Sequence, residues 1–338
     1  MNKQVKYCYY GIYSGLIDQY LEYKHALGFY SENIGRRLRC FDRLTIERRE
    51  NVIGITKELF DEWGALYPFE APSNRYTRIS ILRGFSAYLQ LIGYESHVPK
   101  LPKYRSDFAP HIYTKSEMAT IFRECDKLHV YRHYTNSMKC VMPSLIRMLY
   151  GTGIRISEAM RLTHGDVNLS DGILTLRECK NGQDRIAPMS LSLTEVCKDF
   201  VAYKQSLGLN TEPNASFFTA ANGSTCCTST ISVLFRTILY RAGLPCAGRG
   251  NNPRLHDLRH TFCVNALVKM SESGMDLYYS MPVLMTYMGH KSLSATNRYV
   301  RITEEMYPDL IQKVNVMYKY VFPEIGIEPS KIQDDETN

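Results

Sequence analysis

The stretch "DGILTLRECKNGQDRIAPMS", residues 171–190, carries the clearest β signal in a chain whose other patterns are mostly helical. Apolar and polar residues alternate on both sides of Asn181-Gly182, a dipeptide that favours the tight turn of a hairpin. The pattern predicts two antiparallel strands with Lys180 at the turn. One hairpin among helices indicates a mainly α chain with a small β component.

Helical patterns flank this hairpin. A helix is predicted over residues 116–128, and another leads through "PSLIRMLYGTGIRISEAMRL", residues 143–162. Gly151 and Gly153 are expected to end that helix and to place Arg155 at the tight turn into the next. From Leu191 onward the pattern is helical again, apart from an expected strand at residues 216–219.

The N-terminal part predicts a compact helical bundle. Apolar residues recur at helical spacing over residues 12–27, from Ser31 onward, over 56–66 and over about 73–92. Thr56 is expected to cap the third helix. Short amphipathic helices that follow one another so closely are typical of a bundle. The inward faces are expected to hold Ile34, Leu38, Phe41, Ile79, Leu82, Leu89 and Ile92.

A proline-containing basic stretch, "ESHVPKLPKYRSDFAPHIYT", follows the bundle. Three prolines favour a semi-extended linker between domains. The predicted organisation is a helical domain over residues 1–94, a linker over 95–113, a second domain over 114–323 and an acidic tail over 324–338.

The net charge of +7 is unevenly distributed. Residues 1–106 carry 16 Lys and Arg against 11 Asp and Glu, and residues 107–323 carry 24 against 18. Such a balance fits a polyanionic partner, because bound phosphates release counterions. Basic residues of the bundle and the linker are the predicted DNA contacts: Arg36, Arg39, Arg43, Arg75, Arg78, Lys100, Lys103 and Arg105.

The ten cysteines include no C-x-x-C pair, which argues against a disulfide framework or a zinc knuckle and favours reduced thiols. No apolar run approaches the length of a membrane span. We therefore expect a cytoplasmic protein associated with the nucleoid and no membrane partner.

Two further stretches complete a series of polar residues: "RLHDLRHTFCVNAL", residues 254–267, and "MGHKSLSATNRYV", residues 288–300. In chain order, the series resembles the active-site residues of the tyrosine recombinase family, the DNA integrases and resolvases. The resemblance covers nearly the whole chain and implies a SAM-like helical bundle followed by a mixed α+β catalytic domain. The residues that carry it are Arg155, Lys180, His256, Arg259, His290 and Tyr299.

The resemblance implies a role for each residue. Tyr299 is the nucleophile that forms a 3′-phosphotyrosine, and Arg155 and Arg259 hold the phosphate oxygens. Lys180 protonates the departing 5′-oxygen. His256 accepts the phenolic proton or binds a phosphate oxygen, and His290 donates to the same oxygens; the sequence leaves this division open. No metal or other cofactor is implied.

The resemblance also implies partners. These are double-stranded DNA with short inverted-repeat core sites, a second protomer on one site and four protomers in a synapse that passes through a Holliday junction. Accessory recombinases or directionality factors are further candidates. Because the chain begins almost at the bundle, the extra N-terminal DNA-binding domain of phage-lambda-like integrases is expected to be absent.

Several biological roles fit this chemistry. Integration, excision or transposition of a mobile element is favoured, and a Xer-like resolvase of chromosome or plasmid dimers is the alternative. A type IB topoisomerase would use a similar set of residues but would relax supercoils without exchanging partners. A catalytically silent DNA-binding protein would bind a site without becoming covalently attached, and the intact series argues against it.

His256 and His260 also stand four residues apart, the spacing at which a helix can bind zinc. Asp257 replaces the glutamate of zinc proteases, and no third ligand follows at a recognisable spacing. We therefore interpret His260 as a buried structural histidine.

Overall fold

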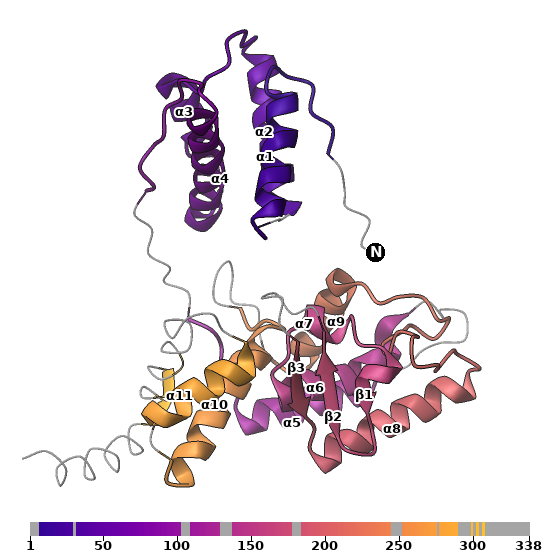
Figure 1. Cartoon of the computed structure of the whole chain (residues 1–338). Helices are drawn as coiled ribbons and strands as arrows, with labels where there is room; N and C mark the ends of the chain where they lie inside the picture. The colour runs from indigo at the N-terminus through magenta and orange to yellow at the C-terminus, as the bar shows by residue number, and fades with distance from the viewer. Residues whose placement is uncertain are drawn as a thin grey trace, which may run out of the picture. The chain divides into compact units, whose positions relative to one another are not determined.

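The computed structural model describes residues 7–29, 32–102, 109–128, 137–177, 184–244, 252–275, 277–289, 299, 302–303 and 306–307. The chain divides into two compact units, residues 1–107 and residues 108–338 (Figure 1). Each unit has its own hydrophobic core.

The described part of the first unit is the predicted helical bundle. It consists of α1 (Ser14–Ala26), α2 (Glu32–Glu47), α3 (Lys57–Gly64) and α4 (Pro72–Leu91). The Thr56 hydroxyl accepts a hydrogen bond from the Leu59 amide at 3.2 Å, which confirms the predicted cap of α3. The predicted burial of Ile92 is wrong, because this residue follows α4 and is 39% exposed.

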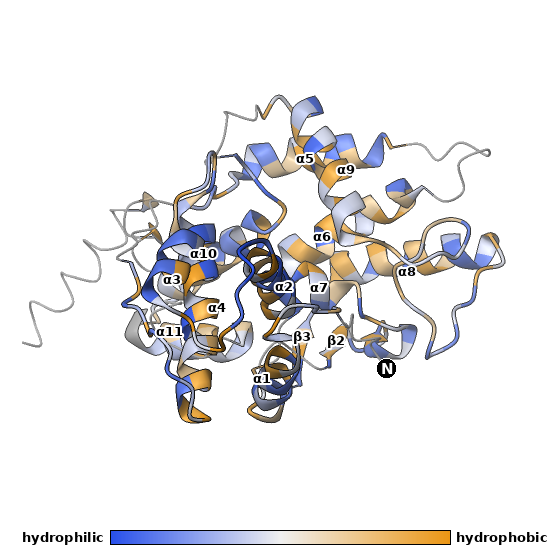
Figure 2. Ribbon diagram, turned by 90° about the horizontal axis from the view of Figure 1, so that it is seen from above, coloured by the Kyte–Doolittle hydropathy of each residue, from blue (hydrophilic) through white to orange (hydrophobic). Residues whose placement is uncertain are grey.

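The second unit is built around a central helix. Helix α6 (Met142–Thr152) contacts α5 (Lys115–Asp126), α8 (Leu191–Ser206) and α10 (Asp257–Glu272). Much of α6 has the colour of apolar residues in Figure 2, as expected for a helix with neighbours on several sides. Two further helices, α9 (Thr228–Arg241) and α11 (Leu277–Met288), pack on α5 and α10 respectively.

A small antiparallel sheet completes the second unit. Strands β2 (Ile173–Leu176) and β3 (Arg185–Pro188) pair with Leu176 opposite Arg185, which confirms the predicted hairpin. A short strand, β1 (Val167–Asn168), joins β2 on its other side and was not predicted. The turn of the hairpin, with Lys180, lies outside the described residues.

The predicted strand at residues 216–219 is wrong. Ser216 and Thr219 form only isolated bridges, to Thr163 and Thr225. The backbone of this stretch has another partner, since the ammonium group of Lys204 donates to the carbonyl oxygens of Ser216 and Phe217 at 2.8 and 2.9 Å. A buried lysine thus takes acceptors that a sheet would need.

The predicted glycine turn before Arg155 is confirmed at Gly153, whereas Gly151 lies inside α6 and does not end it. Helix α6 ends at Thr152, and Gly153 follows with a φ of +62°. A Cβ atom at Gly153 would lie 2.4 Å from the Phe262 ring, so both the backbone conformation and the space require glycine. Arg155 is then the N-cap residue of the short helix α7 (Ile156–Ala159).

Both ends of the predicted linker pack against the unit on their side. The His97 amide donates to the Ile55 carbonyl oxygen at 2.7 Å in the first unit. In the second unit, the Tyr113 amide donates to the Thr261 hydroxyl at 3.0 Å. Lys103, Arg105 and the predicted acidic tail lie outside the described residues. Among the described helices, none has the length and apolar character to cross a membrane.

Candidate active site

A buried carboxylate holds the first candidate arginine. Glu158 Oε1 accepts from Arg155 Nη1 at 2.8 Å, and Glu158 Oε2 accepts from the Arg155 amide at 2.7 Å. The same carboxylate accepts from Arg185 Nη2 at 2.7 Å. The side chain of Arg155 is 19% exposed, whereas that of Glu158 is 2% exposed. The hydrogen bonds to Glu158 therefore fix the orientation of Arg155, while part of its side chain stays exposed.

The electrostatics of Glu158 favour its charged form. Burial alone would raise the pKa of this carboxyl group, but the Arg155 amide and the charges of Arg185 and Arg155 lower it further than burial raises it. The net result is a pKa below the ordinary value of a glutamate. Glu158 thus stays ionised and keeps both arginines in place.

The second candidate arginine lies at the start of α10. Arg259 is 3% exposed, and its Nη1 donates to the Gly153 carbonyl oxygen at 2.8 Å. Burial, together with the nearby charge of Arg155, lowers the pKa of Arg259 to about 10. This group remains cationic at neutral pH, and the two arginines place positive charge on one region.

Two guanidinium groups also meet the C-terminal end of α11. Arg185 Nη1 donates to the Tyr287 carbonyl oxygen at 3.0 Å, and Arg259 Nη2 donates to the Met288 carbonyl oxygen at 2.7 Å. Cations are favourable here because the last carbonyl groups of a helix carry partial negative charge. Gly289 follows with a φ of +62°. The next residue, the candidate His290, lies outside the described residues.

The candidate nucleophile contacts a histidine. Tyr299 is 4% exposed, and its hydroxyl oxygen lies 2.9 Å from His260 Nδ1. The backbone carbonyl of Tyr299 accepts from the Thr303 hydroxyl at 2.8 Å. His260 is buried, as expected, but the sequence did not predict its contact with Tyr299.

His256 has a different environment from His260. It is the N-cap residue of α10 and is exposed, and its ring centre lies 4.9 Å from that of His260. The exposed ring is accessible to a phosphate, whereas the buried ring faces Tyr299. As for zinc, the described part of the chain contains no group of three or more His, Cys, Asp or Glu residues that could hold a metal ion.

The candidate DNA contacts of the bundle differ in exposure. Arg36 and Arg43 are exposed on α2, and Arg39 is half-buried between them. Arg75 is half-buried, and its Nε donates to the Gly64 carbonyl oxygen at 2.8 Å. Lys100 is exposed. These residues stay candidates for DNA contact.

The predicted DNA contact of Arg78 is wrong. Its side chain is buried, and Nη2 lies 2.6 Å from Glu70 Oε2 and 2.8 Å from the Ala65 carbonyl oxygen. The guanidinium carbon stands 4.0 Å from the centre of the Tyr67 ring. Arg78 therefore ties α4 to the segment that follows α3 and cannot reach a phosphate.

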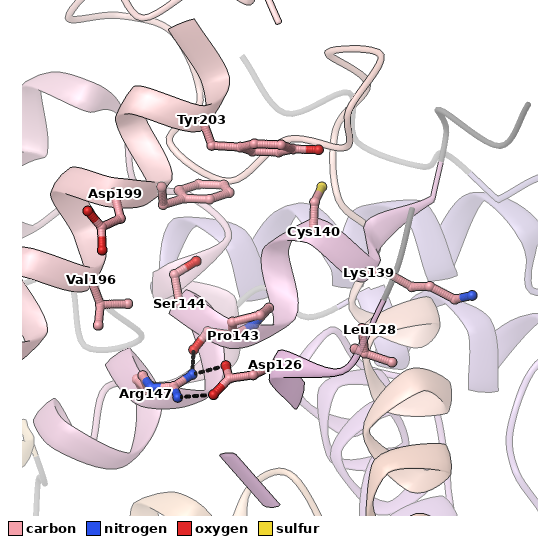
Figure 3. Close-up of a pocket in the computed structure, with 11 residues that line it drawn as sticks. Asp126, Leu128, Lys139, Cys140, Pro143, Ser144, Arg147, Val196, Asp199 and Tyr203 are labelled. Atoms are coloured by element: carbon pink, nitrogen blue, oxygen red, sulfur yellow. Dashed lines mark hydrogen bonds and ion pairs between the residues drawn. The ribbon is translucent and has the colours of Figure 1, made fainter. Parts of the chain in front are cut away.

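Two cavities of the second unit differ in their position relative to the candidate site. One, of about 510 Å³, is lined in part by Arg147 and Asp126, which form a bidentate ion pair at 2.8 and 2.7 Å (Figure 3). Among the candidate catalytic residues that the structure describes, none lines it. A second cavity, of about 470 Å³, includes Glu158 in its wall and lies beside the sheet.

Known recombinases resemble the chain over most of its length. A protein of Sinorhizobium fredii named as integrase/recombinase y4rB is 26% identical over 311 residues, which cover 88% of this chain and 95% of that protein. The tyrosine recombinase XerC of Oceanobacillus iheyensis is 27% identical over 303 residues, which cover 86% of this chain and 92% of XerC.

Solved structures share the fold. A lambda integrase dimer bound to a COC′ core site matches with a TM-score of 0.60 at 15% identity, over 84% of this chain and 94% of that one. The XerH recombinase bound to a palindromic difH substrate matches with a TM-score of 0.59 at 18% identity, over 79% of this chain and 75% of that one. The predicted fold class, mainly α with a small β component, is confirmed.

The family itself follows from a match to the second unit. The model described as the phage integrase family matches residues 112–306, which contain all six candidate catalytic residues. Because this match spans more than half of the chain, the chain belongs to the phage integrase family and is a tyrosine-type site-specific recombinase.

Proposed function

We propose that the protein exchanges DNA strands through a covalent bond between Tyr299 and a 3′-phosphate. The observation that carries this proposal is the convergence of three elements on the start of α10. Arg259 of this helix binds the turn that presents Arg155, and its neighbour His260 binds Tyr299. Residues far apart in the sequence thus form one site.

The arrangement suits a phosphodiester substrate. The tyrosine oxygen attacks phosphorus, and the resulting ester conserves the energy of the broken bond, so that no water or nucleotide is needed to reseal the strand. Negative charge develops on the non-bridging oxygens during attack, and two planar guanidinium groups can bind them with paired hydrogen bonds. Arg155 and Arg259 are those groups.

The remaining roles stay with the residues that the family resemblance names. Lys180 protonates the departing 5′-oxygen from the turn between β2 and β3. His290 follows the end of α11, which Arg185 and Arg259 bind, and contributes a hydrogen bond to a non-bridging oxygen. His256 is exposed at the start of α10 and also contributes a hydrogen bond to a non-bridging oxygen.

The proposed substrate is double-stranded DNA with short inverted-repeat core sites. Related folds have been solved on DNA: XerH on its difH substrate and the Tn1549 integrase on transposon end DNA. Each site binds a dimer, and two sites form a tetramer that resolves a Holliday junction. We favour a mobile element as the source of the DNA, with accessory recombinases or directionality factors as further partners. A Xer-like resolvase is the alternative.

One experiment tests this proposal against its rivals. The full chain is incubated with supercoiled plasmids that carry one or two copies of the DNA flanking its gene. Recombination predicts deletion or inversion between two copies and a covalent protein–DNA product at each site. Relaxation of both plasmids without rearrangement would indicate a topoisomerase. Binding without any covalent product would indicate a silent DNA-binding protein and overturn the proposal.

A further inference from the structure

We propose that His260 is a catalytic residue, which binds the Tyr299 hydroxyl before attack and takes its proton as the tyrosine–phosphorus bond forms. This inference rests on the proposed function of Tyr299. It concerns a histidine outside the six residues that the sequence assigns to the site, and it answers which group receives the phenolic proton.

The contact has the geometry of a strong hydrogen bond. His260 Nδ1 lies 2.9 Å from the Tyr299 oxygen, within the reach required of a general base. The ring centres are 5.5 Å apart and inclined by 43°, so the contact runs through the hydroxyl group and not through stacked faces. A neutral imidazole with its hydrogen on Nε2 accepts the phenolic hydrogen at Nδ1.

Burial protects this hydrogen bond from competition by water. His260 is 9% exposed and Tyr299 is 4% exposed, so water has little access to compete for the hydroxyl. Cys263, one turn further along α10, also lies within hydrogen-bond reach of the phenol, and burial raises the pKa of its thiol to about 12. The thiol stays protonated at neutral pH, so it does not act as a base.

The nearby arginine supports the transfer. The charges of Arg259 and Tyr299 interact, and the cation stabilises negative charge on the phenolic oxygen. His256 is less suited to this task, because it is exposed, whereas His260 is buried and contacts the Tyr299 hydroxyl. The two histidines of the H-x-x-x-H pair thus have different roles: His256 contacts the DNA, and His260 binds the nucleophile.

The step balances as follows. The Tyr299 oxygen forms a bond to phosphorus, the bond from phosphorus to the 5′-oxygen breaks, and the phenolic proton moves to His260 Nδ1. The 5′-oxygen receives a separate proton from the acid assigned to Lys180. In the reverse step a 5′-hydroxyl attacks, and His260 returns its proton to the departing tyrosine.

The test makes the phenol more acidic. A ring-fluorinated tyrosine is placed at position 299 of the full chain, alone and together with His260→Gln, and single-turnover cleavage is measured on a nicked duplex of the DNA that the chain binds. A fluorinated phenol releases its proton more readily and depends less on a base. We expect His260→Gln to slow cleavage by about 10²- to 10⁴-fold. Fluorination of Tyr299 in this variant should recover at least about tenfold of the lost cleavage rate.

A matched control separates this effect from a loss of structure. His164 is another partly buried histidine with a polar partner, Lys204 Nζ at 2.8 Å, and lies outside the site. His164→Gln should cleave like the parent and should show no selective gain from fluorination. Thermal unfolding and site binding, measured for every variant, identify any that do not fold; His260→Asn then replaces His260→Gln.

Three results would overturn the inference: normal cleavage by His260→Gln, slow cleavage that fluorination does not selectively restore, or faster cleavage, which would mean that His260 restrains the tyrosine. Failure of the proposed function itself looks different. In that case the parent chain forms no covalent product, or Tyr299→Phe still forms one.

Discussion

Glu158 lies between Arg155 and Arg185 and accepts a hydrogen bond from each guanidinium group, at 2.8 Å and 2.7 Å. It connects the turn after α6 with strand β3, which leads out of the hairpin that carries Lys180. Arg185 extends the connection to the end of α11. One residue thus links three segments that supply candidate catalytic residues.

Loss of Arg185 should therefore affect both stability and cleavage. Arg185→Met leaves a buried carboxylate with one fewer cation, and we expect a loss of about 3 kcal/mol in the free energy of unfolding. Cleavage should slow more than site binding weakens. Urea unfolding and single-turnover cleavage measure the two effects. Lys198→Met, which breaks an exposed pair with Glu195, should cost at most about 1 kcal/mol; equal losses in both variants would contradict this account.

His164 should make stability depend on pH. Burial and the charge of Lys204 lower the pKa of His164 to about 4. Between about pH 4 and pH 6.5 the unfolded chain binds a proton at His164 that the folded chain does not, so stability falls as the pH falls through this window.

The comparison is with His164→Gln, which keeps an acceptor for Lys204. Relative to this variant, the parent should lose about 1–3 kcal/mol between pH 6.5 and pH 4. Chemical unfolding at several pH values measures the difference. A difference that stays constant over this range would show that His164 titrates alike in both states.

Arg78 should act on the stability of the bundle and not on DNA affinity. Arg78→Met leaves Glu70 buried without its ion-pair partner, which costs about 3–5 kcal/mol. Arg83→Met, on the exposed side of the same helix, should change stability by less than about 0.5 kcal/mol. The single tryptophan, Trp63, donates to the Arg78 carbonyl oxygen, so its fluorescence reports unfolding of this unit.

Local signals in the sequence predicted much of the fold and part of the site. Thr56 and the Gly153 turn act within a few residues of their own position, and the alternation around Asn181-Gly182 predicted the pairing of β2 with β3. The strand prediction for residues 216–219 was wrong, because backbone carbonyl groups of this stretch bind Lys204. This residue lies on α8, and no local pattern reveals it as a partner.

The errors at charged and polar residues have the same origin. Arg78 lies on the same helix as the exposed Arg83, and only the fold shows that Glu70 and Tyr67 cover it. The contact between His260 and Tyr299 joins residues 39 positions apart. A single sequence supplies the residue types for such a contact but carries no signal for the approach itself.

The effect of replacing Lys180 on the cleavage rate should depend on the leaving group. If its ammonium group protonates the 5′-oxygen, Lys180→Ala should slow cleavage by about 10²- to 10⁴-fold. A substrate with sulfur in place of the bridging 5′-oxygen needs no such proton and should restore most of the rate. Arg155→Ala, which loses charge stabilisation at the non-bridging oxygens, should not recover. Equal responses of the two variants to sulfur would remove Lys180 from the role of acid.

The central claim is that Tyr299 becomes joined to DNA. The most direct measurement compares the parent chain with Tyr299→Phe on a nicked duplex that traps the covalent product, with site binding followed in parallel. The substitution removes one oxygen and keeps the buried ring, so binding should be unchanged and the covalent product should disappear. A covalent product of normal yield with Tyr299→Phe would show that the nucleophile is another residue and would contradict the account.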